Sequence, residues 1–257
     1  MSRWKASALH LIISFLVVGS IAGLIYFLWF PYHLIRIAGM DRLLLTMLGV
    51  DIVAGPLLTL IVFKAHDLRQ TRRDLAVIGL LQLSFMAYAV HTAWITRPVF
   101  LIWSVDQMHL LYANEIEPRH LAQGRTPETR SLSWTGPRLF AVSLPKDHEA
   151  RAKIFEDIIR EQSSLERLPE QYAAYEGARA AILKASDRLD KLPRPKRLIE
   201  SHLDSAVASS GRRREQLRLV PISSSRDVSY LLLDAETAAP IVVVAPTPVS
   251  ALPAPQE

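Results

Sequence analysis

The residue whose chemistry most needs an explanation is Asp51, a carboxylate within the otherwise apolar stretch 43–63. It lies eight residues into that stretch, about 12 Å along a helix. A carboxylate at such a depth in a bilayer costs on the order of 3 kcal/mol, which makes it a candidate for function. Two interpretations stay open. Asp51 contacts another protein, or it is protonated or hydrogen-bonded within its own chain, for which Tyr88 and His91 lie at similar depth.

The dipeptide Gly55-Pro56 follows Asp51 by one turn of a helix. Proline has no amide hydrogen, so Pro56 leaves the carbonyl of Ile52 without its helical donor and favours a kink there. A kink beside a carboxylate opens a small polar notch. We therefore predict that Asp51, Gly55 and Pro56 face another helix at this depth.

Two glycines four residues apart, Gly19 and Gly23, form a GxxxG pattern in the first apolar stretch. Glycines at this spacing let a second helix approach the backbone closely. The pattern is common in membrane helices, so alone it identifies no partner. We predict helix packing at these glycines and favour a contact within the chain; Tyr88 and His91 are further candidates for helix packing.

Four histidines border the apolar stretches, two towards each end: His10, His33, His66 and His91. Two such pairs suggest axial ligands of a b-type haem. An interfacial histidine needs no metal, however, because its amphipathic ring suits the membrane surface. We therefore expect no metal and no cofactor.

The sequence contains no familiar catalytic arrangement. It has no GxSxG, no HExxH and no glycine-rich phosphate loop, and the histidines after residue 100 lack ligand spacing. It also has no cysteine, which excludes disulfides, thiolate metal sites and a cysteine nucleophile. We expect a protein that is not an enzyme.

Three apolar stretches must position these residues, namely 7–30, 43–63 and 75–95. Each meets the roughly 20 apolar residues that a helix needs to cross the hydrocarbon core. The sequence therefore predicts a membrane protein whose residues 1–97 form a three-helix transmembrane region. A cleavable signal peptide is the alternative for the first stretch, but the apolar run continues through Phe30, well past the small-residue pattern that ends at Ala22.

Positive charge is concentrated in the N-terminal part. Residues 1–97 hold nine Lys or Arg and four Asp or Glu, and the remaining residues hold 21 of each, so the net charge of +5 lies in the first part. These basic residues border apolar stretches instead of forming one face, which argues against a nucleic-acid partner. The positive-inside rule places the N-terminus and the loop 64–74 in the cytoplasm. Three crossings then place the chain after Arg97 on the far side, which is the periplasm in a bacterium.

The part after the third stretch, residues 98–244, is predicted to be a mixed α+β domain in the periplasm. Its β-branched and aromatic runs predict strands, and its amphipathic runs predict helices. The expected strands are two within 98–114, then 138–144, 216–222, 227–233 and 240–244. The expected helices are 147–160, 170–190 and 196–209, with Ile154, Phe155, Ile158 and Ile159 buried on the first. The proline-rich tail, residues 245–257, is predicted to be disordered.

Several motifs resemble those of the type IV pilin accessory proteins of the TfpX/TfpZ kind. They include Gly49-Val-Asp51, Gly55-Pro56-Leu-Leu-Thr-Leu-Ile-Val-Phe-Lys64, Arg97-Pro98-Val99 and Ser104-Val-Asp106. The likeness covers most of the chain and is densest in residues 1–110. Proteins of this family are encoded near pilin genes and modulate the assembly of a cognate pilin, and the family supplies no established catalytic site.

The resemblance implies an inner-membrane accessory protein, chaperone-like in character, that binds a cognate type IV pilin. The expected partners are this pilin and the lipid bilayer, and the sequence leaves the oligomeric state open. We expect Asp51 and the Gly55-Pro56 kink to contact the pilin helix within the membrane. Two alternatives remain: a membrane-anchored sensor of a periplasmic ligand, and a b-type haem redox protein.

Overall fold

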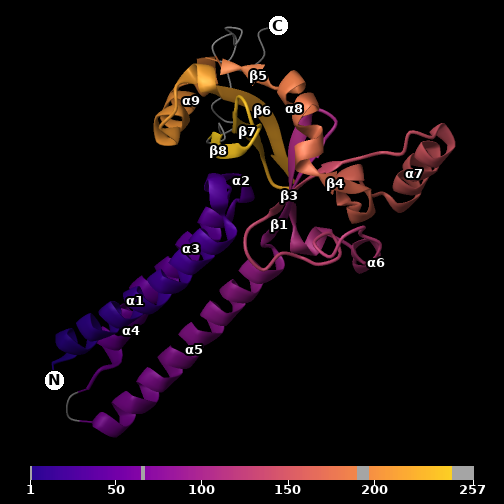
Figure 1. Ribbon diagram of the computed structural model, residues 1–257. Coiled ribbons are helices and arrows are strands. Elements are labelled where there is room, and N and C mark those ends of the chain that lie inside the picture. Colours follow the sequence, from indigo (N-terminus) through magenta and orange to yellow (C-terminus); the bar gives the residue numbers. More distant parts are fainter. Residues whose placement is uncertain (1, 65–66, 190–196, 245–257) are drawn as a thin grey trace, which may run out of the picture. The chain divides into compact units, whose positions relative to one another are not determined.

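The computed structural model describes residues 2–64, 67–189 and 197–244 (Figure 1). The chain divides into two compact units. The helical unit comprises Met1–Leu28 and Gly39–Thr96, and the sheet domain comprises Trp29–Ala38 and Arg97–Glu257. The predicted disordered tail, 245–257, lies outside the described residues.

Three helices of the helical unit are long and apolar enough to cross a membrane, which confirms the predicted spans. The first is α1 (Arg3–Trp29), the second combines α3 (Met40–Leu48), η2 (Gly49–Ala54) and α4 (Gly55–Val62), and the third is α5 (Leu68–Ile95). Each begins before its apolar stretch, because the polar residues ahead of that stretch continue the helix. The side chain of Asp67 caps α5 by accepting a hydrogen bond from the amide of Gln70 at 3.0 Å.

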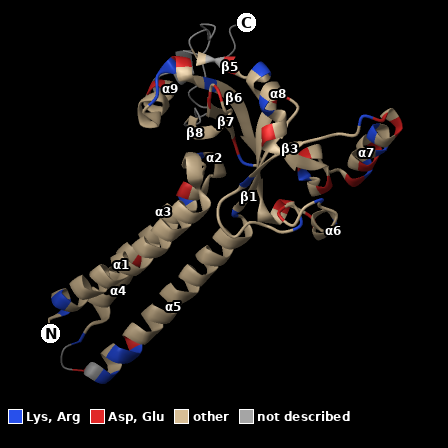
Figure 2. Cartoon of the chain, in the orientation of Figure 1, with Lys and Arg blue, Asp and Glu red and all other residues tan. Residues whose placement is uncertain are grey.

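The helices of this unit pack through a narrow apolar seam and expose apolar side chains elsewhere. Val18, Met47 and Ala89 form the buried cluster between α1, α3 and α5. Side chains such as Phe27 and Ile61 are exposed, as lipid-facing residues of a membrane span must be. Figure 2 shows Lys and Arg gathered at the N-terminal ends of α1 and α5.

The second unit is built on one mixed sheet of eight strands. The strands are β1 (Pro98–Ser104), β2 (Gln107–Tyr112), β3 (Arg138–Val142), β4 (Tyr172–Ala174), β5 (Asp187–Arg188), β6 (Leu217–Ser224), β7 (Val228–Asp234) and β8 (Pro240–Val244). Their order is β4-β3-β1-β2-β6-β7-β8, and β5 pairs with β6 outside this path. The pairs β1/β3 and β2/β6 are parallel and the others antiparallel. The expected mixed α/β domain is therefore confirmed.

The longer helices of this unit are α6 (Pro118–Ala122), α7 (His148–Glu161), α8 (Arg179–Ala185) and α9 (Arg197–Ser210). Strand β1 is buried along its whole length, as its continuous apolar sequence indicates. On the β8 side, Leu203 of α9 packs with Leu219, Leu232 and Val242 of three neighbouring strands. The core of the domain thus lies between the sheet and its helices.

The predicted helix 170–190 is confirmed only over α8, because the residues before α8 and those of β5 after it are not α-helical. The chain there forms η5 (Pro169–Gln171), strand β4 and η6 (Tyr175–Ala178) before α8 begins. The reason is tertiary packing, because the buried ring of Tyr172 lies 5.3 Å from the ring of Phe100 and 5.8 Å from that of Phe140, between centroids. An aromatic anchor of this kind overrides helix propensity.

A further expectation about this domain needs correction. The apolar side of α7 was expected to be buried, but Phe155 is 42% exposed and Ile159 is 78% exposed. The periodicity of α7 identifies its apolar face correctly without showing whether this chain covers it.

The loop between the first two spans belongs to the core of the sheet domain, a placement that differs from the predicted region 1–97. Phe30, Leu34 and Ile37 are almost fully buried. Ser224 donates to the carbonyl of Ile37 at 3.1 Å, and Arg226 donates to that of Ala38 at 2.6 Å. The apolar residues of this loop therefore serve as core residues of a domain whose sheet begins about 60 residues later in the chain.

Replacing Ile37 by Ala should destabilise the sheet domain by about 3 kcal/mol, because the substitution leaves a cavity at a fully buried site. Arg36→Ala is the matched control, since Arg36 is exposed in the same loop. Thermal unfolding of the full chain in detergent, followed by tryptophan fluorescence, measures both. Equal unfolding temperatures for the two variants would show that the loop is not part of the core.

Candidate functional site

Polar side chains from all three spans gather inside the helical unit. They are Ser7 and His10 of α1, Asp51 of η2, Thr59 of α4 and Gln82 of α5. Hydrogen bonds within a membrane are made between such residues because hydrocarbon offers no water as an alternative. We refer to these five residues as the intramembrane cluster.

Gln82 connects the three spans. Its Nε2 atom donates to the backbone carbonyl of Asp51 at 3.1 Å, and its Oε1 atom lies 2.9 Å from Nε2 of His10. The segment η2 around Asp51 is a π-helix, in which a carbonyl pairs with the amide five residues later. Residue 56 is proline and has no amide hydrogen, so the carbonyl of Asp51 needs another donor.

The carbonyl that receives this side-chain donor is one residue earlier than predicted. Normal α-helical geometry indicated that the carbonyl of Ile52 lacks an amide donor. In the wider π turn, the carbonyl without an amide donor is that of Asp51. The carbonyl of Pro56 is also engaged, since Ser7 donates to it at 2.8 Å. The Gly55-Pro56 segment is therefore held by side chains of both α1 and α5.

The hydrogen-bond network assigns the tautomer of His10. Because Oε1 of Gln82 only accepts, Nε2 of His10 carries the hydrogen, and Nδ1 then accepts from the Thr59 hydroxyl at 2.6 Å. The donors run in one direction, from Thr59 through His10 and Gln82 to the carbonyl of Asp51. A neutral His10 satisfies every contact in this chain of hydrogen bonds.

Gly55 makes room for this arrangement. A Cβ atom added at Gly55 would lie 2.2 Å from Nε2 of Gln82, whereas one added at Gly49 would meet nothing within 4 Å. Gly55 and Pro56 are both buried. The glycine is therefore required by the close approach of the Gln82 side chain.

The side chain of Asp51 is buried among the helices of its own chain. It is 3% exposed, and its Oδ1 atom has no hydrogen-bond partner. The suggested partners do not lie beside it, since Tyr88 is 70% exposed and His91 is exposed as well. A second helix can reach Asp51, Gly55 or Pro56 only if the three spans separate here. The predicted notch was open to another helix without such a separation.

The GxxxG glycines do not pack within the described part of the chain. A Cβ atom added at Gly19 or Gly23 would meet no atom of a neighbouring element within 4 Å. Helix α1 instead packs through Val18, with Ile21 and Ala22 beside it. The favoured contact within the chain is therefore wrong, and the glycine side of α1 is open.

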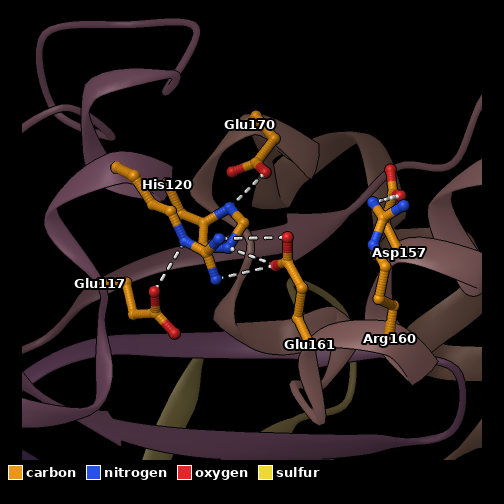
Figure 3. Close-up of polar contacts among 7 residues, drawn as sticks. Glu117, His120, Asp157, Arg160, Glu161 and Glu170 are labelled. Carbon is orange, nitrogen blue, oxygen red and sulfur yellow. Dashed lines mark hydrogen bonds and ion pairs between the residues drawn. The ribbon is translucent and has the colours of Figure 1, made fainter.

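A second polar cluster ties helices together in the sheet domain (Figure 3). His120, 8% exposed, places Nδ1 at 2.8 Å from Glu170 and Nε2 at 3.2 Å from Glu161. Arg119 forms a bidentate pair with Glu161 at 3.0 and 3.1 Å and also bonds Glu117 at 2.7 Å. These contacts fasten the C-terminal end of α7 to α6 and η5. Within the described residues, no group of three His, Cys, Asp or Glu is suited to a metal ion.

A polar cavity of about 230 Å³ lies between β2, β6 and η4 (Leu165–Arg167). In it, Nδ1 of His109 lies 3.2 Å from the Ser223 hydroxyl and 3.8 Å from a Glu166 carboxylate oxygen. Both neighbours approach the same ring nitrogen, whereas a catalytic triad uses both nitrogens of the imidazole. These three residues therefore lack the geometry of a serine nucleophile with its base.

Comparisons with known proteins connect this chain to pilus biogenesis. A family model described as fimbrial assembly protein FimB matches residues 1–39. Relatives from Dichelobacter nodosus include the fimbrial assembly proteins of serogroup E1, 27% identical, and serogroup I, 26% identical, each with 89% of both chains covered. That of serogroups C1 and C2 is 32% identical over 44% of this chain and 86% of its own length. The chain belongs to the fimbrial assembly protein family.

The matched parts of this fimbrial assembly protein include its membrane region and its sheet domain, since the longer alignments cover 231 residues. The match to residues 1–39 includes α1 and the loop that enters the sheet domain. The relatives are named for assembly, not for a reaction. No solved structure matches the chain.

Sequence reasoning missed most members of the intramembrane cluster. Gln82 and Thr59 are polar residues within apolar stretches, and this is the signal that would have singled them out. His10 was considered only as an interfacial residue or haem ligand. Depth in the bilayer alone favoured Tyr88 and His91, because it does not tell which side of a helix faces its neighbours.

Gly55→Ala should destabilise the helical unit of this fimbrial assembly protein by about 1–2 kcal/mol. The added methyl group displaces the Gln82 side chain and breaks its hydrogen bonds to Asp51 and His10. Gly49→Ala, six residues earlier in open space, is the control and should be neutral. Unfolding in mixed micelles with increasing denaturing detergent measures both variants, and equal midpoints would contradict the assigned role of Gly55.

Burial lowers the pKa of His109, although Glu166 and Asp106 act in the opposite direction. The folded chain therefore binds fewer protons at this site than the unfolded chain, and the free energy of unfolding should fall as the pH drops below about 6.5. His109→Gln should reduce this loss, whereas His148→Gln, at an exposed position, should not. Unfolding temperatures of the wild type and both variants between neutral and mildly acidic pH test the effect; identical pH dependences would refute it.

Proposed function

We propose that this chain is an inner-membrane accessory protein that binds a cognate type IV pilin and modulates its stability or its assembly into pili. The observation that carries the proposal is the similarity to fimbrial assembly proteins over 89% of the chain. The motifs that resemble the TfpX/TfpZ pilin accessory proteins support the same function. A chaperone-like role fits a protein whose described residues show no arrangement of a known catalytic type.

The proposal includes an orientation. The N-terminus and the connection between α4 and α5 lie in the cytoplasm, and the sheet domain lies in the periplasm. The support is the distribution of charge, because Arg3 and Lys5 precede α1, while Lys64, Arg69, Arg72 and Arg73 lie at the connection. The opposite loop, 31–42, carries only Arg36 and Arg42 among its basic residues.

This layout suits a pilin as the partner. Before assembly, a pilin is held in the inner membrane by one apolar helix, with its globular head in the periplasm. A protein that handles it needs helices in the bilayer and a domain on the side of the head. Three spans followed by a sheet domain supply both.

Within this proposal, the carboxylate of Asp51 pairs with positive charge on the pilin, such as its N-terminus. Oδ1 of Asp51 has no hydrogen-bond partner in the chain, and a cationic group would supply one. Because Asp51 is 3% exposed, the pilin helix must enter beside Gln82 and part the spans at Gly55 and Pro56.

Deletion of the gene in its native host tests the general function. Surface pili should be lost or altered while pilin is still made, and the wild-type gene supplied in trans should restore them. Electron microscopy of surface pili and immunoblots of total pilin give the two readouts. Normal pili in number and length, with every pilin of the genome tested, would refute the proposal.

Asp51→Asn tests the charge separately from the packing. The substitution keeps the shape and removes the charge, so cross-linking of the pilin helix to the second span should fall while the variant accumulates normally. Gly55→Ala is the counterpart, because it disturbs the intramembrane cluster and keeps the charge. If Asp51→Asn leaves cross-linking and piliation unchanged, Asp51 serves the packing of its own chain.

A further inference from the structure

Among the described α-helices of the sheet domain, α7 is the one without a fully buried residue. Helices α6, α8 and α9 each contribute at least one buried side chain to the domain. Figure 1 shows α7 set apart from the strands. An isolated helix of 14 residues is marginally stable in water, so the contacts that hold α7 determine which of its sides stays open.

One side of α7 is held by the rest of the domain. Ile154 and Ile158, one turn apart, are half-buried, and the carboxylate of Glu161 lies 3.2 Å from the ring of His120 of α6 (Figure 3). At the other end of the helix, the side chain of Asp147 accepts a hydrogen bond from a backbone amide of the first turn at 2.8 Å. These contacts fix the helix and leave its other side to solvent.

The open side of α7 carries a row of apolar side chains. Phe155 is 42% exposed and Ile159 is 78% exposed, and the exposed Ala152 lies on the turn before them. We refer to Ala152, Phe155 and Ile159 as the α7 ridge. Single exposed apolar residues are common, but three neighbours along a helix form a continuous strip that another protein surface can cover.

Two exposed carboxylates, Glu149 and Glu156, border the α7 ridge along one flank. They lie seven residues apart, which places them two turns apart on the same side of the helix. Within the described part of the chain neither forms an ion pair, although Lys153 lies between them in the sequence, whereas Asp157 and Glu161 of the same helix are both paired. The negative charge beside the ridge is therefore not neutralised by a contact within the domain.

An apolar strip with an acidic border fits a partner surface whose apolar side chains are bordered by Lys or Arg. Apolar contact supplies affinity, while opposite charges across the border orient the partner and disfavour acidic surfaces. A second copy of this chain fits less well. In an antiparallel pair of α7 helices related by a two-fold axis, Glu149 and Glu156 of one copy face the same flank of the other.

We propose that the α7 ridge docks the cognate pilin, through a surface of the pilin that has apolar side chains bordered by Lys or Arg. The inference rests on the proposed function for the identity of the partner, and it adds the surface of the sheet domain that binds this partner. It is independent of the contact proposed for Asp51, because it involves residues of the sheet domain alone.

Photo-cross-linking of the full chain in its native host tests the docking. Ile159 is replaced by benzoylphenylalanine, and the matched control carries the same photoreactive residue in place of Ala208, an exposed position of α9. Immunoblots for the pilin after illumination measure the adduct. At equal accumulation of the two variants, position 159 should give several-fold more pilin adduct than position 208.

Charge reversal tests the acidic border in the same assay. Glu149→Lys combined with Glu156→Lys, added to the variant with the photoreactive residue at position 159, should lower the pilin adduct several-fold. Glu215→Lys combined with Glu236→Lys is the matched control and should leave the adduct unchanged. It makes the same change of net charge at exposed positions outside α7.

Equal adducts from positions 159 and 208, or equal losses from the two charge reversals, would overturn the proposal. An adduct of two copies of this chain, or a cross-link within one chain, would also overturn it, because the ridge would then be covered by something other than pilin. Deletion of the gene separates this failure from that of the proposed function. Altered surface pili without a pilin adduct at position 159 refute the inference alone, whereas normal pili refute the proposed function.

Discussion

A proline in the middle of a membrane span removes one amide hydrogen where no water can replace it. The polar contacts of the helical unit follow from this missing hydrogen-bond donor. The second span widens into a π turn before Pro56, and the carbonyl of Asp51 is left for a side-chain donor. Gln82 reaches it only because residue 55 is glycine. Gln82 then needs a donor for its own oxygen, which His10 supplies, and His10 needs Thr59. One missing hydrogen thus determines polar residues in all three spans.

The two units are joined by more than the single connection that a linear division of the chain suggests. The chain passes between them three times, after Leu28, after Ala38 and after Thr96. The segment between the first two passages contributes Leu34 and Ile37 to the sheet-domain core. Arg226 makes this attachment polar as well as apolar, since its guanidinium bonds the carbonyl of Ala38 and lies 4.9 Å from the centre of the Tyr112 ring. Unfolding of the sheet domain would release the loop that joins the first two spans.

The sequence predicts the elements that depend on local composition. It does not predict the elements and contacts that depend on residues distant in the chain. Three spans follow from apolar length, and strands such as β1 and β7 follow from β-branched and aromatic runs. Strand β4 was missed because Tyr172 packs against residues about 30 to 70 positions earlier in the chain. Of the intramembrane cluster, the sequence singles out Asp51, together with the adjacent Gly55-Pro56 pair. Gln82 was missed because hydropathy gives depth but not the rotation of one helix against another.

Within the intramembrane cluster, the packing of the helices does not explain the side-chain carboxyl of Asp51. The hydrogen bonds from Thr59 through His10 and Gln82 are satisfied by neutral groups, and they end on the backbone carbonyl of Asp51. Among the described residues of the helical unit, Oδ1 of Asp51 is the buried side-chain oxygen without a hydrogen-bond partner. Any residue with a carbonyl would serve Gln82 equally well, so the carboxylate adds a cost on the order of 3 kcal/mol that the observed contacts of Oδ1 do not offset. A partner that brings positive charge into the span would offset this cost, which is the role that the proposed function gives to the pilin.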